Sequence, residues 1–134
     1  MTTVGPEPAD RWAWAKALGE VNSVDFVAAA AARFAELRDD PAAPANLRVD
    51  AQRERALRLA WHQRPDGLSE LDVAIAADPE RAEQLLLWKL QLLVALERWA
   101  DARALGVALG ARAAKLDPHE QELLARLRKL AADR

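Results

Sequence analysis

Residues 85–118 read LLLWKLQLLVALERWADARALGVALGARAAKLDP, and this stretch decides the fold. Its first half, up to Leu96, contains only two polar residues, Lys89 and Gln91, which predicts a helix covered on most sides by the rest of the chain. The second half is again rich in helix-forming residues and ends in an Asp-Pro pair, where a helix cannot continue. The stretch therefore predicts two consecutive helices joined by a short turn at LERW.

The Asp-Pro pair recurs along the chain at intervals of 38 and 39 residues. Its three copies are Asp40–Pro41, Asp78–Pro79 and Asp117–Pro118. A fixed period of this length is the signature of a helical repeat. Each copy closes a pair of predicted helices, so we expect three helical hairpins, 10–39, 45–77 and 80–116, followed by one helix that caps the C-terminal end.

Local signals set the expected helix ends. We expect helices over 10–18, 24–38, 45–63, 70–77, 80–96, 99–115 and from 118 to the C-terminus. Asp10, Ser23 and Ser69 are the expected N-caps, because their side chains can accept a hydrogen bond from the first free backbone amides. Gly19 is expected to end the first helix, and Gly67 to supply a positive φ in the turn RPDG.

Length and composition place the chain among globular helical proteins. It has 134 residues, of which 51% are hydrophobic, enough for one domain with a buried core. We expect residues 1–9, which contain Gly5, Pro6 and Pro8, to form a flexible tail, and 10–134 to form a single domain. The content of Ala, Arg and Leu suggests a bacterial genome rich in G and C.

Charge and cysteine content exclude several classes of protein. The net charge is −2 and cysteine is absent, so we expect no nucleic-acid partner, no disulfide and no thiolate metal site. The N-terminal residues lack the basic and apolar regions of a signal peptide, and no apolar run reaches membrane-spanning length. We therefore expect a soluble cytoplasmic protein with no membrane contact.

The organisation resembles the tetratricopeptide repeat (TPR) family, which pairs antiparallel helices in units of about 34 residues. The match is best in 85–118, where Trp99 occupies the aromatic position after the turn and Ala102 the small position between the two helices. Lys89 stands near the place of the family's usual small residue. The resemblance implies an all-α fold, an α-α superhelix in which the first helix of each hairpin lines a groove for a partner.

The apolar helix 80–96 permits two interpretations. It is the central helix of the solenoid, covered by its neighbours, or one side of it lines a groove that receives a peptide or helix of a partner. That side consists of Leu86, Leu90, Leu93 and Val94. The same surface could also form a permanent homodimer or subunit interface. Trp61 and Trp88 are expected in the core.

The third predicted helix carries a row of polar residues at helical spacing. The row consists of Arg48, Gln52, Arg55 and His62. In one interpretation these side chains form a solvated face on which charges pair within the chain. In the other they form a basic wall that grips an acidic segment or a C-terminal carboxylate of a partner.

Small residues follow the second helix of the last hairpin at helical spacing. They are Ala102, Gly106, Gly110 and Ala113. Each interior glycine costs a helix about 1 kcal/mol relative to alanine, so we expect close packing against the fifth or seventh helix, or a close homodimer contact.

Nothing in the sequence indicates an enzyme. Neither His62 nor His119 lies at metal-ligand spacing from a carboxylate cluster, and no glycine-rich phosphate loop is present. We expect no cofactor and no catalytic residue. The sequence favours a protein-interaction module, an adaptor or a small dedicated chaperone, with the structural subunit or homodimer as the alternative.

Overall fold

The computed structural model describes residues 7–20 and 24–134, and within them it contains seven α-helices and no strand. The helices are α1 (Pro8–Glu20), α2 (Val24–Asp39), α3 (Ala45–Trp61), α4 (Asp66–Ala77), α5 (Ala82–Ala95), α6 (Trp99–Gly110) and α7 (Pro118–Ala132). Two short 3-10 helices, η1 (Pro79–Arg81) and η2 (Ala113–Lys115), lie between hairpins. The predicted all-α fold, with three hairpins and a terminal helix in this order, agrees with these elements.

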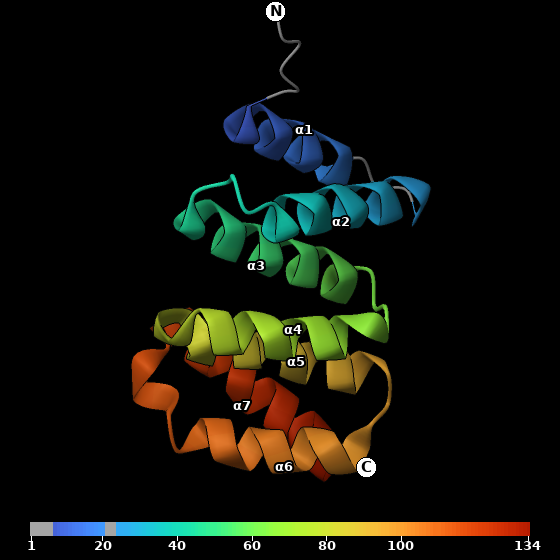
Figure 1. Cartoon of the computed structure of the whole chain (residues 1–134). Coiled ribbons are helices and arrows are strands. Elements are labelled where there is room, and N and C mark those ends of the chain that lie inside the picture. Colours follow the sequence, from blue (N-terminus) through green and yellow to red (C-terminus); the bar gives the residue numbers. More distant parts are fainter. Residues whose placement is uncertain (1–6, 21–23) are drawn as a thin grey trace, which may run out of the picture.

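In Figure 1, α1 to α4 follow one another from the top, α5 lies behind α4, and α7 lies between α5 and α6. Each helix packs against the next one in the chain, and the odd-numbered helices also contact each other, α1 with α3, α3 with α5, and α5 with α7. The odd-numbered helices α3, α5 and α7 therefore form a continuous series of contacts, in which α5 lies behind α4 (Figure 1).

The core consists of three clusters of buried side chains, and α5 belongs to two of them. Leu87, Leu90 and Leu93 pack with buried leucines of α6 and α7. Leu85 and Leu92 point to another side of α5 and pack with residues of α3 and α4. Burying a leucine side chain stabilises the fold by roughly 1.5–3 kcal/mol. Because its leucines are buried in both clusters, α5 holds the last two hairpins and α7 together. The third cluster joins α1, α2 and α3 around Phe34 and Leu37.

Several expected caps are wrong. α1 begins at Pro8 rather than after Asp10, and it continues past Gly19 to Glu20. α4 begins at Asp66, because Pro65 already has helical torsions (φ −58°, ψ −32°). Ser69 therefore lies inside α4, where its hydroxyl donates a hydrogen bond of 3.1 Å to the carbonyl of Asp66.

The other local expectations have mixed outcomes. Ser23, the expected cap of α2, and most of the expected 1–9 tail lie outside the described residues. The predicted helix 99–115 is interrupted, because α6 ends at Gly110 and η2 follows. α7 starts at Pro118 as expected, and a capping box holds its first turn: the Asp117 carboxylate accepts a 2.8 Å hydrogen bond from the Glu120 backbone, and the Glu120 carboxylate accepts one of 3.0 Å in return.

Two hairpins turn in the same way. α3 and α5 are each followed by a residue with a positive φ, Gln63 at 55° and Glu97 at 57°. At Glu97 the backbone N–H donates to the carbonyl of Val94, and the next N–H, of Arg98, donates to that of Leu93. In the same way, the backbone N–H of Gln63 donates to the carbonyl of Ala60, and that of Arg64 donates to the carbonyl of Leu59. This pair of bonds defines the Schellman motif at a helix C-terminus. The LERW turn is therefore a Schellman motif without glycine.

Gly67 has a different role from the expected one. Among the described glycines none has a positive φ, and Gly67 is a buried residue in the first turn of α4. A Cβ added at Gly67 would lie 3.0 Å from the backbone nitrogen of Ala60 and 3.0 Å from a methyl group of Leu92. Glycine is needed here because α4 approaches the backbone of α3 closely.

Close packing also accounts for the glycines of α6, as expected. The side chain of Arg128 in α7 lies across Gly106 and Gly110, where added Cβ atoms would come within 3.0 and 2.5 Å of it. Ala102 is fully buried in the cluster that α5, α6 and α7 share. The small residues therefore admit a long side chain of α7 against the surface of α6.

One carboxylate is buried near the start of α5. Glu83 is only 3% exposed, and it accepts a hydrogen bond from Arg112, with the ammonium group of Lys115 at 4.0 Å. Burial by itself raises the pKa of this carboxyl, but its own backbone N–H and the Arg112 guanidinium outweigh that effect and hold the pKa below the ordinary value of 4.5. Glu83 thus ties α5 to the segment after α6.

Replacing Glu97 by glycine should stabilise the protein. A left-handed conformation costs a non-glycine residue about 1 kcal/mol, so Glu97→Gly should raise the free energy of unfolding by about that amount and Tm by about 4 °C. Thermal unfolding followed by circular dichroism measures the change. Glu97→Ala removes the same charge but keeps the conformational cost, and it should give no gain; an equal gain in both variants would contradict the explanation.

Glu83 should make stability depend on acid pH. Because its pKa is lowered by folding, its contribution to the free energy of unfolding is present above about pH 4.5 and is lost as pH falls through the lowered pKa. Urea unfolding at pH 7 and pH 3 should show Glu83→Gln to be less stable than the parent protein at pH 7, with the difference shrinking at pH 3. A difference that is the same at both pH values would show that the charge of Glu83 is not responsible.

Candidate functional site

The basic residues predicted on the third helix are used within the chain. Arg55 donates a 2.7 Å hydrogen bond to the carbonyl of Ala31 in α2, and its Nε lies 3.1 Å from a carboxylate oxygen of Glu70 in α4. Gln52, which is 2% exposed, donates to the same carboxylate at 2.9 Å and to the Glu70 carbonyl at 3.0 Å. Arg38 completes the cluster, with its guanidinium 2.7 Å from Gln52 and 3.5 Å from Glu70.

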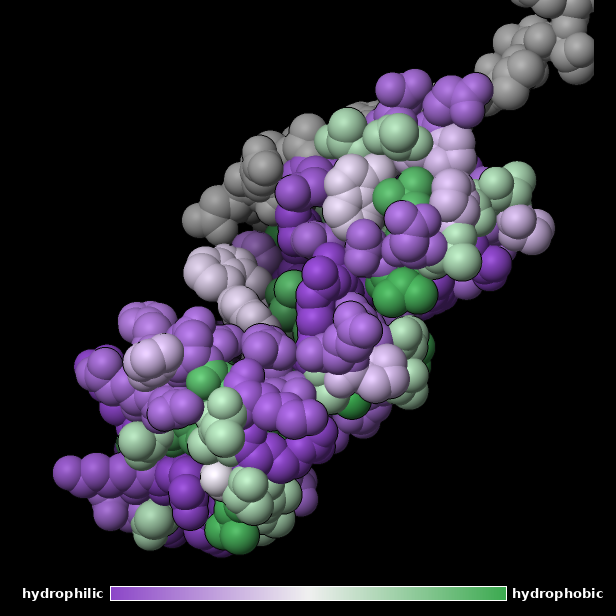
Figure 2. All heavy atoms as spheres, turned by 90° about the vertical axis from the view of Figure 1, so that its left-hand side faces the viewer, coloured by the Kyte–Doolittle hydropathy of each residue, from purple (hydrophilic) through white to green (hydrophobic). Residues whose placement is uncertain are grey.

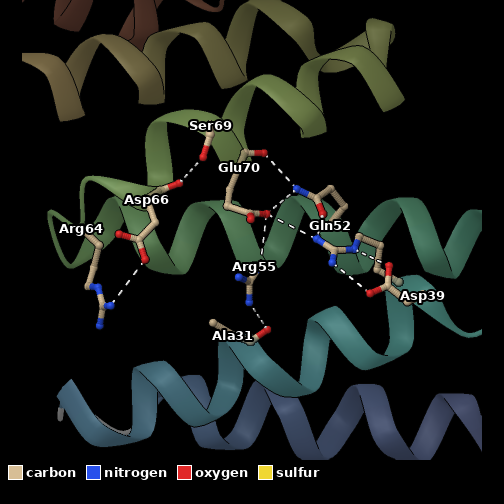
Figure 3. Close-up of polar contacts among 9 residues, drawn as sticks. Ala31, Asp39, Gln52, Arg55, Arg64, Asp66, Ser69 and Glu70 are labelled. Carbon is tan, nitrogen blue, oxygen red and sulfur yellow. Dashed lines mark hydrogen bonds and ion pairs between the residues drawn. The ribbon is translucent and has the colours of Figure 1, made fainter.

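These four residues, Arg38, Gln52, Arg55 and Glu70, form what we call the Glu70 network. Figure 3 shows that Glu70 lies at its centre and that it joins α2, α3 and α4. Arg38 also donates hydrogen bonds to Asp39, and this contact holds the pKa of the Asp39 carboxyl below its ordinary value. The network is a polar contact between consecutive hairpins.

The prediction of a basic wall open to a partner is therefore wrong for Gln52 and Arg55, because a carboxylate of the same chain already occupies them. Arg48 donates a 2.8 Å hydrogen bond to the carbonyl of Arg38 at the end of α2. His62 is the residue after α3 and is partly exposed. The interpretation that charges pair within the chain is the one that the structure supports. A second row of pairs, formed by Asp50, Arg53, Asp78 and Arg81, confirms this pattern.

Arg48 and Gln52 still border a small opening of about 290 Å³ between the start of α3 and the end of α4. Its other lining residues are Arg38, Ala45, Val49, Val73 and Ala77. The face that carries the starts of α3 and α5 is mostly hydrophilic, with separate small apolar patches (Figure 2).

The predicted apolar groove on α5 is also wrong in part. Leu90 is fully buried and Leu93 is 3% exposed, so neither can contact a partner while the fold is closed. Leu86 and Val94 are partly buried and pack against the same cluster. α5 is apolar over most of its surface, and α3, α4, α6 and α7 all pack against it.

A different groove lies on the odd-numbered helices, between the C-terminal halves of α3 and α5. Trp61 is 68% exposed, and its ring centroid lies 5.8 Å from that of Trp88, with the two rings tilted by 52°. The groove beside this pair has a volume of about 240 Å³. We call it the tryptophan groove, and its lining residues are Ala60, Trp61, Gln63, Trp88, Gln91, Leu92 and Ala95.

The expectation that Trp61 belongs to the core is wrong, and Trp88 is only partly buried. A signal for the exposure of Trp61 was present in the sequence. Glu54, Arg58 and Trp61 follow one another at spacings of four and three, so Trp61 continues a polar side of α3 rather than its buried side. Glu54 and Arg58 form an ion pair of 2.6 Å on that side.

Within 7–20 and 24–134, no three residues of the types His, Cys, Asp and Glu come together in a way that could hold a metal ion. No helix among the described residues has both the length and the apolar character needed to cross a membrane. Comparison of the chain with known protein families, characterised proteins and solved structures gave no match, so its function has to be argued from its own residues.

The Glu70 network should contribute measurably to stability. Glu70→Gln removes the charge that Arg38 and Arg55 share in a partly buried place, and it should lower the free energy of unfolding by about 2 kcal/mol. Glu122→Gln is the matched control, because Glu122 pairs with Arg126 on an exposed surface and should change stability by less than about 0.5 kcal/mol. Urea unfolding compares the two. Equal losses would mean that the Glu70 network is no stronger than a surface pair.

Proposed function

We propose that this chain is a protein-interaction domain of the TPR-like, helical-repeat type that binds a peptide or a helix of a partner protein. The odd-numbered helices would carry the binding surface, with Trp61 as its central contact. In this proposal the protein is an adaptor or a small dedicated chaperone that acts by binding rather than by catalysis, in a bacterial cytoplasm.

Two features of the fold support a helical-repeat interpretation. Each odd-numbered helix contacts the next odd-numbered helix, and each even-numbered helix contacts the helices before and after it in the chain. This is the contact pattern of stacked helical hairpins. The two Schellman turns are also equivalent, and 34 residues separate Gln63 from Glu97. This spacing is the length of one TPR unit, although the Asp-Pro pairs recur at a longer interval.

The observation that carries the functional proposal is the exposure of Trp61. Among the described residues, Trp61 is the large apolar side chain with the highest exposed fraction. It lies beside a second tryptophan at the edge of a groove. Tryptophan is enriched among the residues that dominate binding energy at protein interfaces, because it buries a large rigid surface at low entropic cost. Keeping this side chain in water is unfavourable, and a partner that covers it would gain that free energy.

The alternative proposal, a permanent homodimer or subunit interface through helix 80–96, receives less support. This interface requires the leucines of that helix to be exposed, but Leu90 and Leu93 are covered by helices of the same chain. A homodimer could still form around Trp61. Sedimentation velocity over the micromolar range separates this case from a peptide-binding monomer.

Truncation of Trp61 should abolish peptide binding without unfolding the protein. A random peptide library displayed on phage, selected on the parent protein, should yield peptides whose affinity falls at least tenfold for Trp61→Ala. Val107→Ala is the matched control, because Val107 is 66% exposed on α6, away from the groove, and it should leave binding unchanged.

Circular dichroism should show the same helix content for both variants. Selected peptides that bind Trp61→Ala as well as the parent protein would contradict the proposed site. A library that yields no specific peptide would contradict peptide binding by this domain.

A further inference from the structure

The tryptophan groove contains no charged side chain. Its polar lining groups are the amides of Gln63 and Gln91, and neither side chain has a recorded hydrogen bond to the described residues. Amide oxygens accept hydrogen bonds. The groove therefore offers tryptophan rings, amide oxygens that accept hydrogen bonds, and amide and indole N–H groups that donate them, and none of its lining residues is acidic or basic.

Two helices, α3 and α5, end at the groove. Trp61 is the last residue of α3 and Ala95 the last residue of α5, and both line the groove. Among the described residues, no backbone N–H donates to either carbonyl, and Pro65, four residues after Trp61, has no N–H to give. Helix C-termini favour cations, because their unpaired carbonyls carry partial negative charge.

The chain itself shows how its aromatic rings are covered. Arg58 lies over the ring of Phe34, with its guanidinium carbon 5.4 Å from the centroid, and Arg134 lies over Trp99 at 5.3 Å. No such cation is recorded over Trp61 or Trp88 among the described residues. The face of the Trp61 ring is thus the kind of surface that an arginine covers elsewhere in this protein, and here it is open.

We propose that the tryptophan groove binds an arginine side chain of the partner segment, with the guanidinium stacked on Trp61. The proposal rests on the proposed function and specifies its ligand. A guanidinium is planar and weakly hydrated, so it stacks on an indole ring more readily than a lysine ammonium does. Its five N–H groups can also donate to the carbonyls at the ends of α3 and α5 and to the two glutamine amides.

The first experiment measures the chemistry of the groove with a small probe. Nuclear magnetic resonance of the indole N–H groups follows a titration with acetyl-arginine amide at constant ionic strength, and Trp61→Phe identifies the Trp61 signal. The shift of that signal should be at least twofold larger than with acetyl-citrulline amide, an uncharged analogue of the same shape. Equal shifts with the two probes, or no shift with either, would overturn the proposal.

The second experiment separates this proposal from the proposed function. Replacing arginine by citrulline in peptides that bind in a Trp61-dependent way should weaken them by about two- to fivefold per arginine in contact with Trp61. Trp61-dependent peptides that contain no arginine, such as proline-rich segments, would overturn the arginine proposal and leave the interaction domain standing. A response to acetyl-arginine amide without any Trp61-dependent peptide would support arginine binding in the groove and contradict the peptide-binding domain.

Discussion

The burial of α5 is the constraint on which the rest of the structure depends. Its leucines leave the helix in two directions, with Leu85 and Leu92 toward α3 and α4, and Leu90 and Leu93 toward α6 and α7. A helix that is apolar over most of its surface has to be covered on most sides, and this requires neighbours on both sides of it. This requirement brings α7 back against α5 and leaves the side of α3 and α5 near their C-terminal ends as the open part of the odd-numbered helices.

Polar contacts then fix how consecutive hairpins meet. Glu70 of α4 receives donors from α2 and α3 in one place, and Glu83 joins the start of α5 to the segment after α6. A buried or half-buried carboxylate is tolerated only when its oxygens are satisfied, so each contact permits little variation in the position of the helices that supply the donors. Charges that look like a ligand site in the sequence thus form contacts between consecutive hairpins.

The same contacts decide which side chains stay exposed. Four of the eight residues first expected to meet a partner are engaged within the chain: Gln52 and Arg55 bind Glu70, and Leu90 and Leu93 are buried. The other four, Arg48, His62, Leu86 and Val94, are partly exposed. Trp61 has neither constraint. It is the last residue of α3, directly before the Schellman turn at His62 and Gln63, and the backbone hydrogen bonds of that turn give a rigid support to an exposed aromatic side chain.

The sequence by itself determined the number and order of the helices, because proline positions and apolar periodicity act within a few residues, but it misplaced the ends of α1, α4 and α6. It also predicted that Gly106 and Gly110 admit a close contact. Only the tertiary structure decided which charges pair, since the partners of Glu70 lie 15 to 32 residues away along the chain. It also decided that Gly67 serves close packing and that Trp61 is exposed. Those outcomes depend on how helices approach each other in space, and the spacing of residues within one helix does not contain that information.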